Sequence, residues 1–425
     1  MARREIGIEE RLPLVQSLPL SLQHLFAMFG ATVLVPILFK VDPATILLFN
    51  GIGTLLYILI CKGRIPAYLG SSFAFLSPVF VVLGKYGYNS ALGGFIAVGL
   101  VFIAVSLIIS VAGTRWIDVV FPAAAMGAIV AVIGLELIPV AAQMAGIISP
   151  DPKTLWVPDP KAITVSMFTL AVTILGSILF RGFMAIIPIL FGVVAGYVLA
   201  FFMGLVKIAP IAAAQWFSMP TFYRPEFNLS AILIILPAAL VVVAEHIGHL
   251  FVTSNIVGKD LAKDPGLHRS LMGNGVSTLL SGFFGSTPNT TYGENIGVLA
   301  ITKVYSVWVI GGAAVIAILL SFIGKLAAAI QSIPVPVMGG VSLLLFGVIA
   351  ASGIRMLIEA RVDYSKARNL ILTSVVLVIG ISGAQLNVGA VSLKGMGLAT
   401  VIAIGLSIIF KLFDVMGLTA EDQRS

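Results

Sequence analysis

The stretch Gly-Ser-Thr-Pro-Asn-Thr-Thr-Tyr-Gly-Glu-Asn-Ile-Gly at residues 285–297 is a polar interruption in an otherwise apolar chain. The 425 residues are 59% hydrophobic and only 10% charged, and their mean hydropathy is +1.11. A soluble domain carries about 25% charged residues, so this composition predicts an all-α polytopic membrane protein. Non-helical backbone at membrane depth is tolerated only where it is buried in protein or lines a cavity. The polar stretch therefore indicates a buried site within the membrane.

Apolar runs between charged and turn residues predict fourteen transmembrane segments. They are 15–33, 43–61, 66–84, 91–111, 117–139, 162–179, 183–205, 229–250, 268–284, 290–302, 305–323, 329–351, 368–385 and 395–413. The third and tenth are the poorest helices, since 66–84 contains Pro66, Gly70 and Pro78 and 290–302 begins inside the polar stretch. With a cytoplasmic N-terminus, most of the 25 Lys and Arg residues fall on the cytoplasmic side, which is what the positive-inside rule prefers. Both termini are therefore expected in the cytoplasm.

Composition also excludes several classes of protein. The single cysteine, Cys61, rules out a disulfide framework or a cysteine-rich metal site. No glycine-rich run ends in Gly-Lys-Ser or Gly-Lys-Thr, so no Walker A loop is present to hydrolyse ATP. The net charge of +7 is typical of basic cytoplasmic loops rather than of nucleic-acid binding. The basic head is not followed by a small-residue cleavage site, and no removable leader is expected.

The two halves of the chain resemble each other at four points in the same order. Gln23-His24-Leu25 matches Glu245-His246-Ile247, Asn50–Leu56 matches Asn274–Leu280, Gly70-Ser71-Ser72 matches Gly285-Ser286-Thr287, and Pro122…Met126-Gly127 matches Pro334…Met338-Gly339. The shifts are 222, 224, 215 and 212 positions. Seven segments per half is an odd number, so the second copy enters the membrane from the opposite side as an inverted repeat. Paired interrupted helices in such repeats mark the substrate site near the bilayer midplane.

Ionisable residues inside predicted segments are costly and need a reason. Glu245 and His249 are four positions apart on the eighth segment and share one face of a helix. The sequence favours a functional pair suited to proton transfer, with a buried pair that only joins helices as the alternative. Glu294, beside Gly293 in the tenth segment, is expected to accept a hydrogen bond from a ligand. Glu136 has only apolar neighbours in sequence and is expected to be structural or to take part in coupling.

The two remaining histidines within these segments are expected to be structural. His246 lies about 100° round the helix from Glu245, and His24 is its counterpart in the first half of the repeat. His24 is also a candidate to support the site by hydrogen bonds.

At these residues the sequence resembles the nucleobase–cation symporter family that includes xanthine and uracil permeases. Residues 294–303, Glu-Asn-Ile-Gly-Val-Leu-Ala-Ile-Thr-Lys, fit the family pattern [QEP]-N-x-G-x-x-x-x-T-[RKG] at every fixed position. The Gln23-His24 pair is a second family feature, and residues 70–75, 244–249 and 287–295 carry the likeness to members that import uracil with protons. The resemblance covers nearly the whole chain.

The resemblance implies a fold of fourteen segments in two inverted seven-segment repeats, with short antiparallel strands in the third and tenth. It implies a core domain and a gate domain that move against each other, in a multi-pass protein of the bacterial inner membrane. The expected divisions are a cytoplasmic segment 1–14, core domain 15–111 and 229–323, gate domain 117–205 and 329–413, and a cytoplasmic tail 414–425.

Site roles are implied in the same way. Glu245 and Glu294 would hold the base, the backbone at Phe73 and Gly293 would hydrogen-bond it, and His249 with Glu245 would couple protons. Phe73 or Tyr292 can cover a ring face, and His24 and Asn295 are expected to support the site. Phe346 departs from relatives that have Tyr on the twelfth segment, so no hydroxyl from that position takes part.

The function expected is therefore proton-coupled uptake of uracil by alternating access, without a metal or other cofactor and without nucleic acid. The surrounding partner is membrane lipid, and a homodimer through the gate domain is plausible by resemblance. A purine permease of the same family, for xanthine or urate, is the nearest alternative, and sodium coupling stays open. An anion transporter on a similar scaffold would need a cationic site, and an intramembrane enzyme would need a third ligand beside Glu245 and His249.

Overall fold

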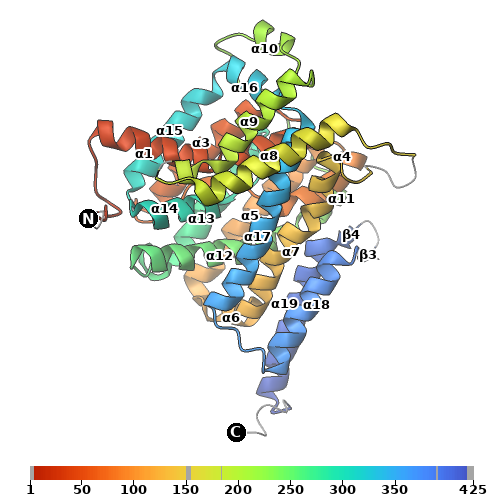
Figure 1. Cartoon of the computed structure of the whole chain (residues 1–425). Helices are drawn as coiled ribbons and strands as arrows, with labels where there is room; N and C mark the ends of the chain where they lie inside the picture. Colours follow the sequence, from red (N-terminus) through yellow and green to blue (C-terminus); the bar gives the residue numbers. More distant parts are fainter. Residues whose placement is uncertain (1–3, 150–154, 183, 389–390, 419–425) are drawn as a thin grey trace.

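The computed structural model describes residues 4–149, 155–182, 184–388 and 391–418 (Figure 1). The ends of the expected segments 1–14 and 414–425 therefore lie partly outside the described residues. Within those residues the protein is mostly helical, and eight helical runs are long and apolar enough to cross a membrane. Four shorter apolar helices of 10–17 residues accompany them. The prediction of a helical protein with many apolar segments is confirmed.

The first half of the chain forms ten helices in the described residues. They are α1 (Leu14–Ala27), α2 (Phe29–Phe39), α3 (Pro43–Ile60), α4 (Leu76–Lys85), α5 (Tyr88–Ala112), α6 (Arg115–Val120), α7 (Ala123–Met144), α8 (Pro160–Leu179), α9 (Pro188–Phe202) and α10 (Ala209–Ala213). The second half contains α11 (Leu229–Ile235), α12 (Pro237–Val257), α13 (Leu267–Phe284), α14 (Gly293–Thr302), α15 (Val307–Ser321), α16 (Gly324–Gln331), α17 (Val335–Glu359), α18 (Ala367–Ile381) and α19 (Gly395–Val415).

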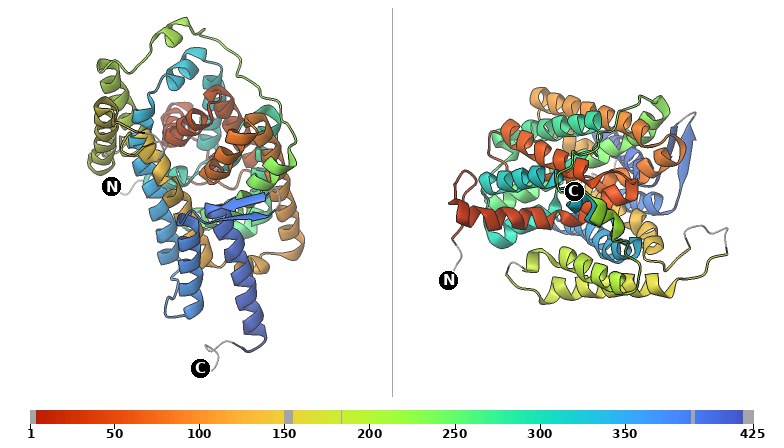
Figure 2. Two further views of the ribbon diagram at one scale, coloured as in Figure 1. Left: turned by 90° about the vertical axis from the view of Figure 1, so that its right-hand side faces the viewer. Right: turned by 90° about the horizontal axis from the view of Figure 1, so that it is seen from above.

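Short strands and single helical turns complete the described structure. The strands are β1 (Leu69–Ser71), β2 (Asn289–Thr291), β3 (Gln385–Val388) and β4 (Val391–Lys394). The turns are η1 (Phe73–Phe75), η2 (Met184–Ile186) and η3 (Ala262–Gly266). β3 and β4 form an antiparallel hairpin between α18 and α19, which stands out at the side of the molecule (Figure 2).

Local sequence explains where several helices begin. The Asp42 carboxylate accepts a hydrogen bond from Ala44 N at 2.9 Å, and Pro43 occupies the first turn of α3. Asp159 caps α8 in the same way through Lys161 N at 2.9 Å. A capping side chain satisfies a backbone donor that the helix itself leaves unpaired, and proline fits the first turn because it lacks that donor.

Several predicted segment boundaries are wrong, and the first and twelfth segments show why. The first segment, predicted as 15–33, is the run α1 and α2, which continues to Phe39 because residues 33–38 are all apolar. The twelfth, predicted as 329–351, begins only at Val335 and extends to Glu359. Residues 324–331 form the separate helix α16 instead, since the chain breaks before Pro334 and the apolar composition of both pieces hides the break.

Helices from the two halves of the chain pack in matched pairs. α7 packs along α17, α3 along α15, and α5 along α13. α8 packs on both α9 and α17, and it lies with α9 along one edge of the molecule (Figure 2). α18 packs on α19 and α7 in the corresponding way. In the repeat, α3 corresponds to α13 and α15 to α5, so the α3–α15 pair is equivalent to the α13–α5 pair. In the same way the α8–α17 pair is equivalent to the α18–α7 pair.

A threonine holds the start of each inner strand. Thr54 Oγ1 on α3 accepts a hydrogen bond from Leu69 N at 2.9 Å, and Thr278 Oγ1 on α13 accepts one from Asn289 N at 3.1 Å. Thr54 and Thr278 are 224 positions apart, as the repeat predicts, and their partners Leu69 and Asn289 are 220 apart. The predicted match of Gly70 with Gly285 is therefore wrong by five residues. The sequence comparison aligned two similar Gly-Ser pairs, whereas the hydrogen bonds align the strands.

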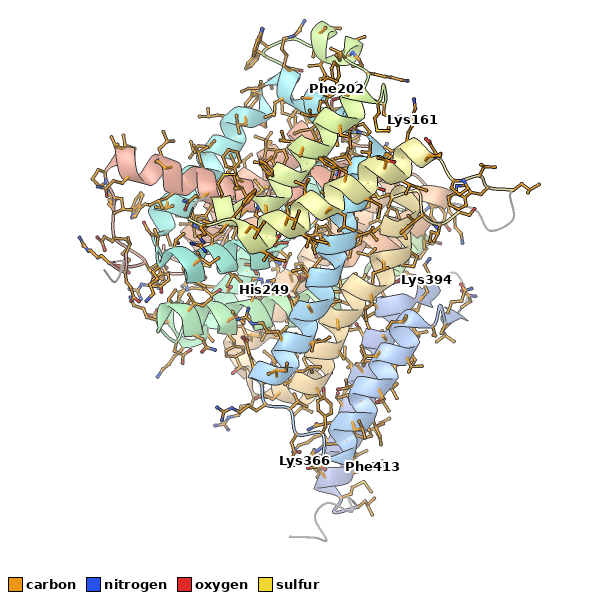
Figure 3. All side chains as sticks on the ribbon, in the orientation of Figure 1. Lys161, Phe202, His249, Lys366, Lys394 and Phe413 are labelled. Carbon is orange, nitrogen blue, oxygen red and sulfur yellow. The ribbon has the colours of Figure 1, made fainter. Side chains whose placement is uncertain are left out.

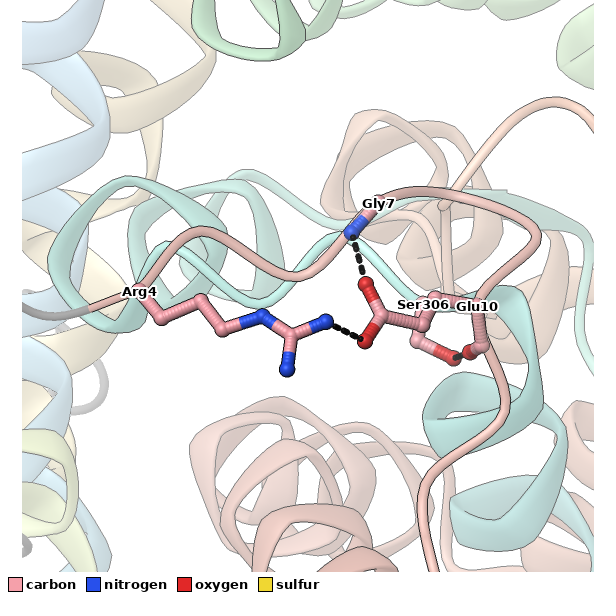
Figure 4. Close-up of polar contacts among 4 residues, drawn as sticks. All are labelled: Arg4, Gly7, Glu10 and Ser306. Atoms are coloured by element: carbon pink, nitrogen blue, oxygen red, sulfur yellow. Dashed lines mark hydrogen bonds and ion pairs between the residues drawn. The ribbon is translucent and has the colours of Figure 1, made fainter.

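The N-terminal segment is docked on the loop between α14 and α15. Ile6 N donates to Lys303 O at 3.0 Å and Tyr305 N donates to Ile6 O at 2.9 Å. Ser306 Oγ donates to Glu10 O at 2.6 Å, while the Glu10 carboxylate binds Arg4 and Gly7 N and closes the segment on itself (Figure 4). Residues 4–11 are thus an ordered part of this end of the fold.

Candidate functional site

The two interrupted segments meet in the interior of the protein. β1 and β2 pair antiparallel, with Leu69 opposite Thr291, Gly70 opposite Thr290 and Ser71 opposite Asn289. The antiparallel strands implied for the third and tenth segments are therefore confirmed. Each strand leads directly into a helical stretch, at Phe73 after β1 and at Gly293 after β2. The first N–H groups of both stretches are free of intrahelical partners, and they lie at the same inner sheet.

A cavity of about 190 Å³ lies against this sheet. Its walls come from both strands, from the starts of η1 and α14, and from α7, α12 and α17. The lining residues are Ser71, Phe73, Val130, Ile133, Glu245, His249, Thr290, Thr291, Tyr292, Gly293, Glu294, Val348, Ile349 and Ser352. His249, labelled in Figure 3, lies among the helices on α12. Six residues that the sequence and the resemblance assign to the site thus share one cavity, although they come from three separate segments.

Two carboxylates face this cavity. Glu245 is on α12 and Glu294 is in the first turn of α14. Glu245 Oε2 is inaccessible to solvent and has no hydrogen-bond partner among the described residues. A buried carboxylate oxygen without a donor is costly, so a ligand N–H placed here would gain a strong, charge-assisted hydrogen bond.

His249 is held by the second strand. Its Nδ1 atom lies 3.1 Å from Thr291 Oγ1, and its Nε2 atom lies 3.5 Å from where a Cβ on Gly293 would stand. No hydrogen bond joins His249 to Glu245 within the described chain, although both side chains line the cavity. Glu245 and His249 therefore line the same cavity without forming a hydrogen bond to each other.

Two aromatic residues border the cavity in different ways. The Phe73 ring is 8% exposed and meets the Phe346 ring edge-on, with centroids 5.9 Å apart. The Tyr292 hydroxyl donates to Ser71 O at 3.0 Å, and its ring packs where a side chain on Gly70 would be. Tyr292 thus braces β1 from β2, whereas Phe73 is the aromatic side chain set between the cavity and α17.

The residues expected to support the site lie outside the cavity. Asn295 Nδ2 donates to His24 O at 2.9 Å and lies 3.2 Å from His24 Nδ1, which joins α14 to α1. His246 Nε2 lies 2.8 Å from Ser270 Oγ, which also bonds the Tyr57 hydroxyl at 2.6 Å. Both histidines are buried in helix packing, as the sequence predicts.

One wall of the cavity, on α7 and α17, was not predicted from the sequence. It consists of Val130 and Ile133 on α7 and Val348, Ile349 and Ser352 on α17. These are ordinary residues of apolar helices, and nothing in the sequence separates them from their neighbours. No Lys or Arg lines the cavity, and no group of three His, Cys, Asp or Glu residues in the described chain could hold a metal ion.

Comparison with known proteins gives a consistent family. Residues 15–389 match the model of the Permease family of xanthine and uracil permeases. The chain is 69% identical to the uracil permease of Escherichia coli K12 over 416 residues, which are 98% of this chain and 96% of the relative. It is 49% identical to the uracil permease of Bacillus subtilis over 397 residues, which are 92% of this chain and 91% of that protein.

Solved structures with the same fold are more distant in sequence. The transmembrane domain of the cyanobacterial bicarbonate transporter BicA aligns with a TM-score of 0.61 at 12% identity, over 95% of this chain and 98% of that one. The murine anion transporter Slc26a9 aligns with a TM-score of 0.68 at 12% identity, over 96% of this chain and 69% of that one. At this level of identity the likeness concerns the fold alone.

Proposed function

The chain belongs to the xanthine/uracil permease family, and from this premise we propose that it takes up uracil across the membrane together with protons. It is a transporter and not an enzyme. The observation that carries the proposal is the cavity at the β1–β2 sheet, where two carboxylates and two free helix starts converge. Relatives named uracil permease at 69% and 49% identity support uracil as the substrate.

The chemistry of the cavity fits a flat ring with two N–H donors and two carbonyl acceptors. Glu245 and Glu294 accept from the ring N–H groups, and the backbone N–H groups of Phe73 and Gly293 donate to the carbonyl oxygens. The Phe73 ring covers one face of the base. A site built on such acceptors rejects analogues that lack the N–H groups, since its buried carboxylates would be left unpaired. Tyr292, whose hydroxyl is bonded to Ser71, positions the strand instead of the base.

Proton coupling follows from two carboxylates around one small, poorly solvated cavity. Their mutual repulsion is strong in a medium of low dielectric constant, and binding of uracil removes the remaining water. Protonation of the Glu245–His249 region relieves this repulsion, so proton binding and uracil binding favour each other. Thr291 holds His249 beside Gly293, where it can exchange a proton with groups in the cavity.

Alternating access requires two bodies, and the packing supports the expected division. The matched helix pairs and the two threonine-held strands support fourteen segments in two inverted repeats. The core domain would comprise residues 15–111 and 229–323, and the gate domain 117–205 and 329–413. The cavity lies between elements of both, since α12 and α14 are in the former and α7 and α17 in the latter.

Orientation and assembly complete the proposal. The face that carries the N-terminal segment and the loops 258–266, 303–306 and 360–366 would be cytoplasmic, in the inner membrane of a bacterium. These loops are rich in Lys and Arg, which supports this orientation. Residues of the gate domain such as Leu175, Ile178 and Phe202 are exposed, which is compatible with contact with lipid or with a second copy.

An anion transporter on the same scaffold is the second candidate, because BicA and Slc26a9 share the fold. An anion site requires positive charge, and the cavity contains two carboxylates and no Lys or Arg. This contrast favours a neutral ligand that donates hydrogen bonds. A purine permease differs in the size of the ring that it carries, and the relatives named uracil permease at 69% and 49% identity favour the smaller base.

The deciding experiment is uptake of radiolabelled uracil into proteoliposomes under an imposed pH gradient, with and without sodium. We expect accumulation that collapses when a protonophore removes the gradient and that unlabelled xanthine does not inhibit. Uptake driven by sodium alone would refute proton coupling, and inhibition by xanthine at the concentration of uracil would favour the purine alternative. Bicarbonate uptake without uracil uptake would establish the anion transporter.

A further inference from the structure

Glu136 is a carboxylate on a membrane-spanning helix that the substrate cavity does not use. It lies on α7, and its two oxygens have different partners. Ser77 Oγ on α4 donates to Oε1 at 2.6 Å, and Met396 N at the start of α19 donates to Oε2 at 3.0 Å. The carboxylate thus ties together three helices that no other described side chain joins in this way. One of them, α4, directly follows β1 and η1, which carry Phe73.

The surroundings of Glu136 are shaped to receive a carboxylate. Gly395 has a φ of +52°, and a Cβ at this position would overlap Glu136 Oε1. The absence of a side chain therefore makes the room in which Glu136 reaches the first N–H groups of α19. The positive end of a helix stabilises a negative charge, and the exposed Lys394 lies next to this helix start, at the end of β4 (Figure 3).

The repeat allows the two sides of the cavity to be compared. α7 begins after Pro122 and α17 after Pro334, so the position equivalent to Glu136 is Val348. The strand alignment makes Gly297 on α14 the equivalent of Ser77. A Cβ on Gly297 would meet no heavy atom within 4 Å, and Val348 is 51% exposed and lines the cavity. Ser77 and Glu136 are thus joined by a hydrogen bond on one side of the cavity, whereas the equivalent Gly297 and Val348 are not in contact on the other.

This asymmetry is what one step of alternating access requires. The cavity is walled by the half of α17 that contains Val348 and Ser352 and by the half of α7 that contains Val130 and Ile133. On the other side, α4 is bound through Glu136 to α7 and α19. A space of only about 20 Å³ remains there between α4, α12 and α19. If α4 moves with β1 against α7, the Ser77–Glu136 bond cannot persist.

We propose that the Glu136 carboxylate is a latch: it closes the substrate site on the side where α4 meets α7 and α19. Release of Ser77 from this carboxylate opens that side. Glu136 is then a positioning residue that sets the equilibrium between the conformations open on either side of the site, without contact with substrate. The inference rests on alternating access as proposed above, but it does not depend on which base is carried.

Ala238 offers a reporter for the opening of this side. It is 2% exposed on α12 and lines the same small space as Ser77 and Met396. We would introduce Ala238→Cys into the full chain, purify it in detergent, and measure the rate of maleimide labelling at each cysteine by mass spectrometry of peptides. The native Cys61 is fully buried at the end of α3 and reports any general loosening of the fold.

The variants differ in the hydrogen bonds that they keep. Glu136→Ala and Ser77→Ala break the latch, and we expect labelling at position 238 to become about tenfold faster, which corresponds to about 1.4 kcal/mol. Glu136→Gln is the matched control. Its amide oxygen can accept from Met396 N and its NH₂ group can donate to Ser77 Oγ, so we expect a rate within about twofold of the parent. Labelling of Cys61 should be the same in every variant.

Three results would overturn the latch. They are an unchanged rate at position 238 in both alanine variants, a rate in Glu136→Gln as high as in Glu136→Ala, and an equal rise at position 238 and Cys61. Uracil uptake by the parent protein is measured separately. A parent that carries no uracil refutes the proposed function, whereas the labelling ratio still tests the latch.

Discussion

Glu245→Gln tests whether a buried carboxylate at the inner sheet receives a ligand N–H. The substitution keeps the shape of the side chain and replaces one oxygen by an NH₂ group. Glu245 Oε2 has no partner among the described residues, so in the proposed complex a ligand N–H is its hydrogen-bond donor. In the variant, either the charge is lost from this bond or a donor faces a donor. We therefore expect uracil to bind more weakly.

The magnitude follows from the kind of bond that is lost. A hydrogen bond to a charged group contributes about 1.5–3 kcal/mol net, and each 1.4 kcal/mol is a factor of ten in affinity. The Kd for uracil should therefore rise roughly 10- to 150-fold. The measurement is equilibrium binding of labelled uracil to purified protein in detergent, over a concentration range wide enough to include the weaker Kd.

A matched control is available on the same fold. Glu136→Gln makes the same chemical change at a second acid of a membrane-spanning helix, outside the cavity, and should leave the Kd within about threefold. Both proteins should elute from size-exclusion chromatography like the parent. A Kd for Glu245→Gln within threefold of the parent, with the fold intact, would refute the assignment of this carboxylate to the base.

Three further predictions follow from contacts around the site and in the N-terminal segment. Thr291→Val removes the hydroxyl beside His249 Nδ1, so stimulation of uptake by a pH gradient should fall several-fold while the Kd for uracil changes little; Thr291→Ser should restore it, and equal losses in both would contradict the role. Gly70→Ala places a Cβ inside the Tyr292 ring and should abolish uracil binding by displacing β1; normal binding would show that the ring is free to move. Ile8→Asp puts a carboxylate at a site that is 3% exposed, which should release residues 4–11 and speed tryptic cleavage there at least about tenfold. The control is a variant that loses the exposed Glu5–Lys303 ion pair. Because such a pair contributes at most about 1 kcal/mol, its loss should not speed tryptic cleavage at residues 4–11.

Sequence patterns singled out ionisable residues that line the inner cavity, because the membrane makes each polar group conspicuous. Glu245 and His249 stand out on an apolar segment and Glu294 in a polar interruption of another, and each is costly within a membrane unless it has a function. The structure places all three on one cavity. Sequence patterns predicted the ends of helices less accurately. The break before Pro334 lies between two apolar helices, so it does not change the average hydropathy along this part of the chain.

The repeat was detected in the sequence but aligned correctly only in three dimensions. Two similar Gly-Ser pairs suggested a shift of 215 positions for the inner strands. The hydrogen bonds of Thr54 and Thr278 set it at 220. That correction makes Phe73 the equivalent of Gly293 and Ser77 the equivalent of Gly297, and the comparison of the two sides of the cavity depends on it.

The amino-acid sequence alone determined the class of the protein, its family and the two acids that line the inner cavity, because hydropathy, charge and a short motif are local properties of the chain. Tertiary structure alone decided which apolar residues wall the cavity, that Tyr292 braces a strand, and that Glu136 has two partners. Ser77, Glu136 and Met396 are separated by 59 and 260 positions. Contacts over such separations depend on how helices pack, and the composition of each helix does not specify which neighbour it meets.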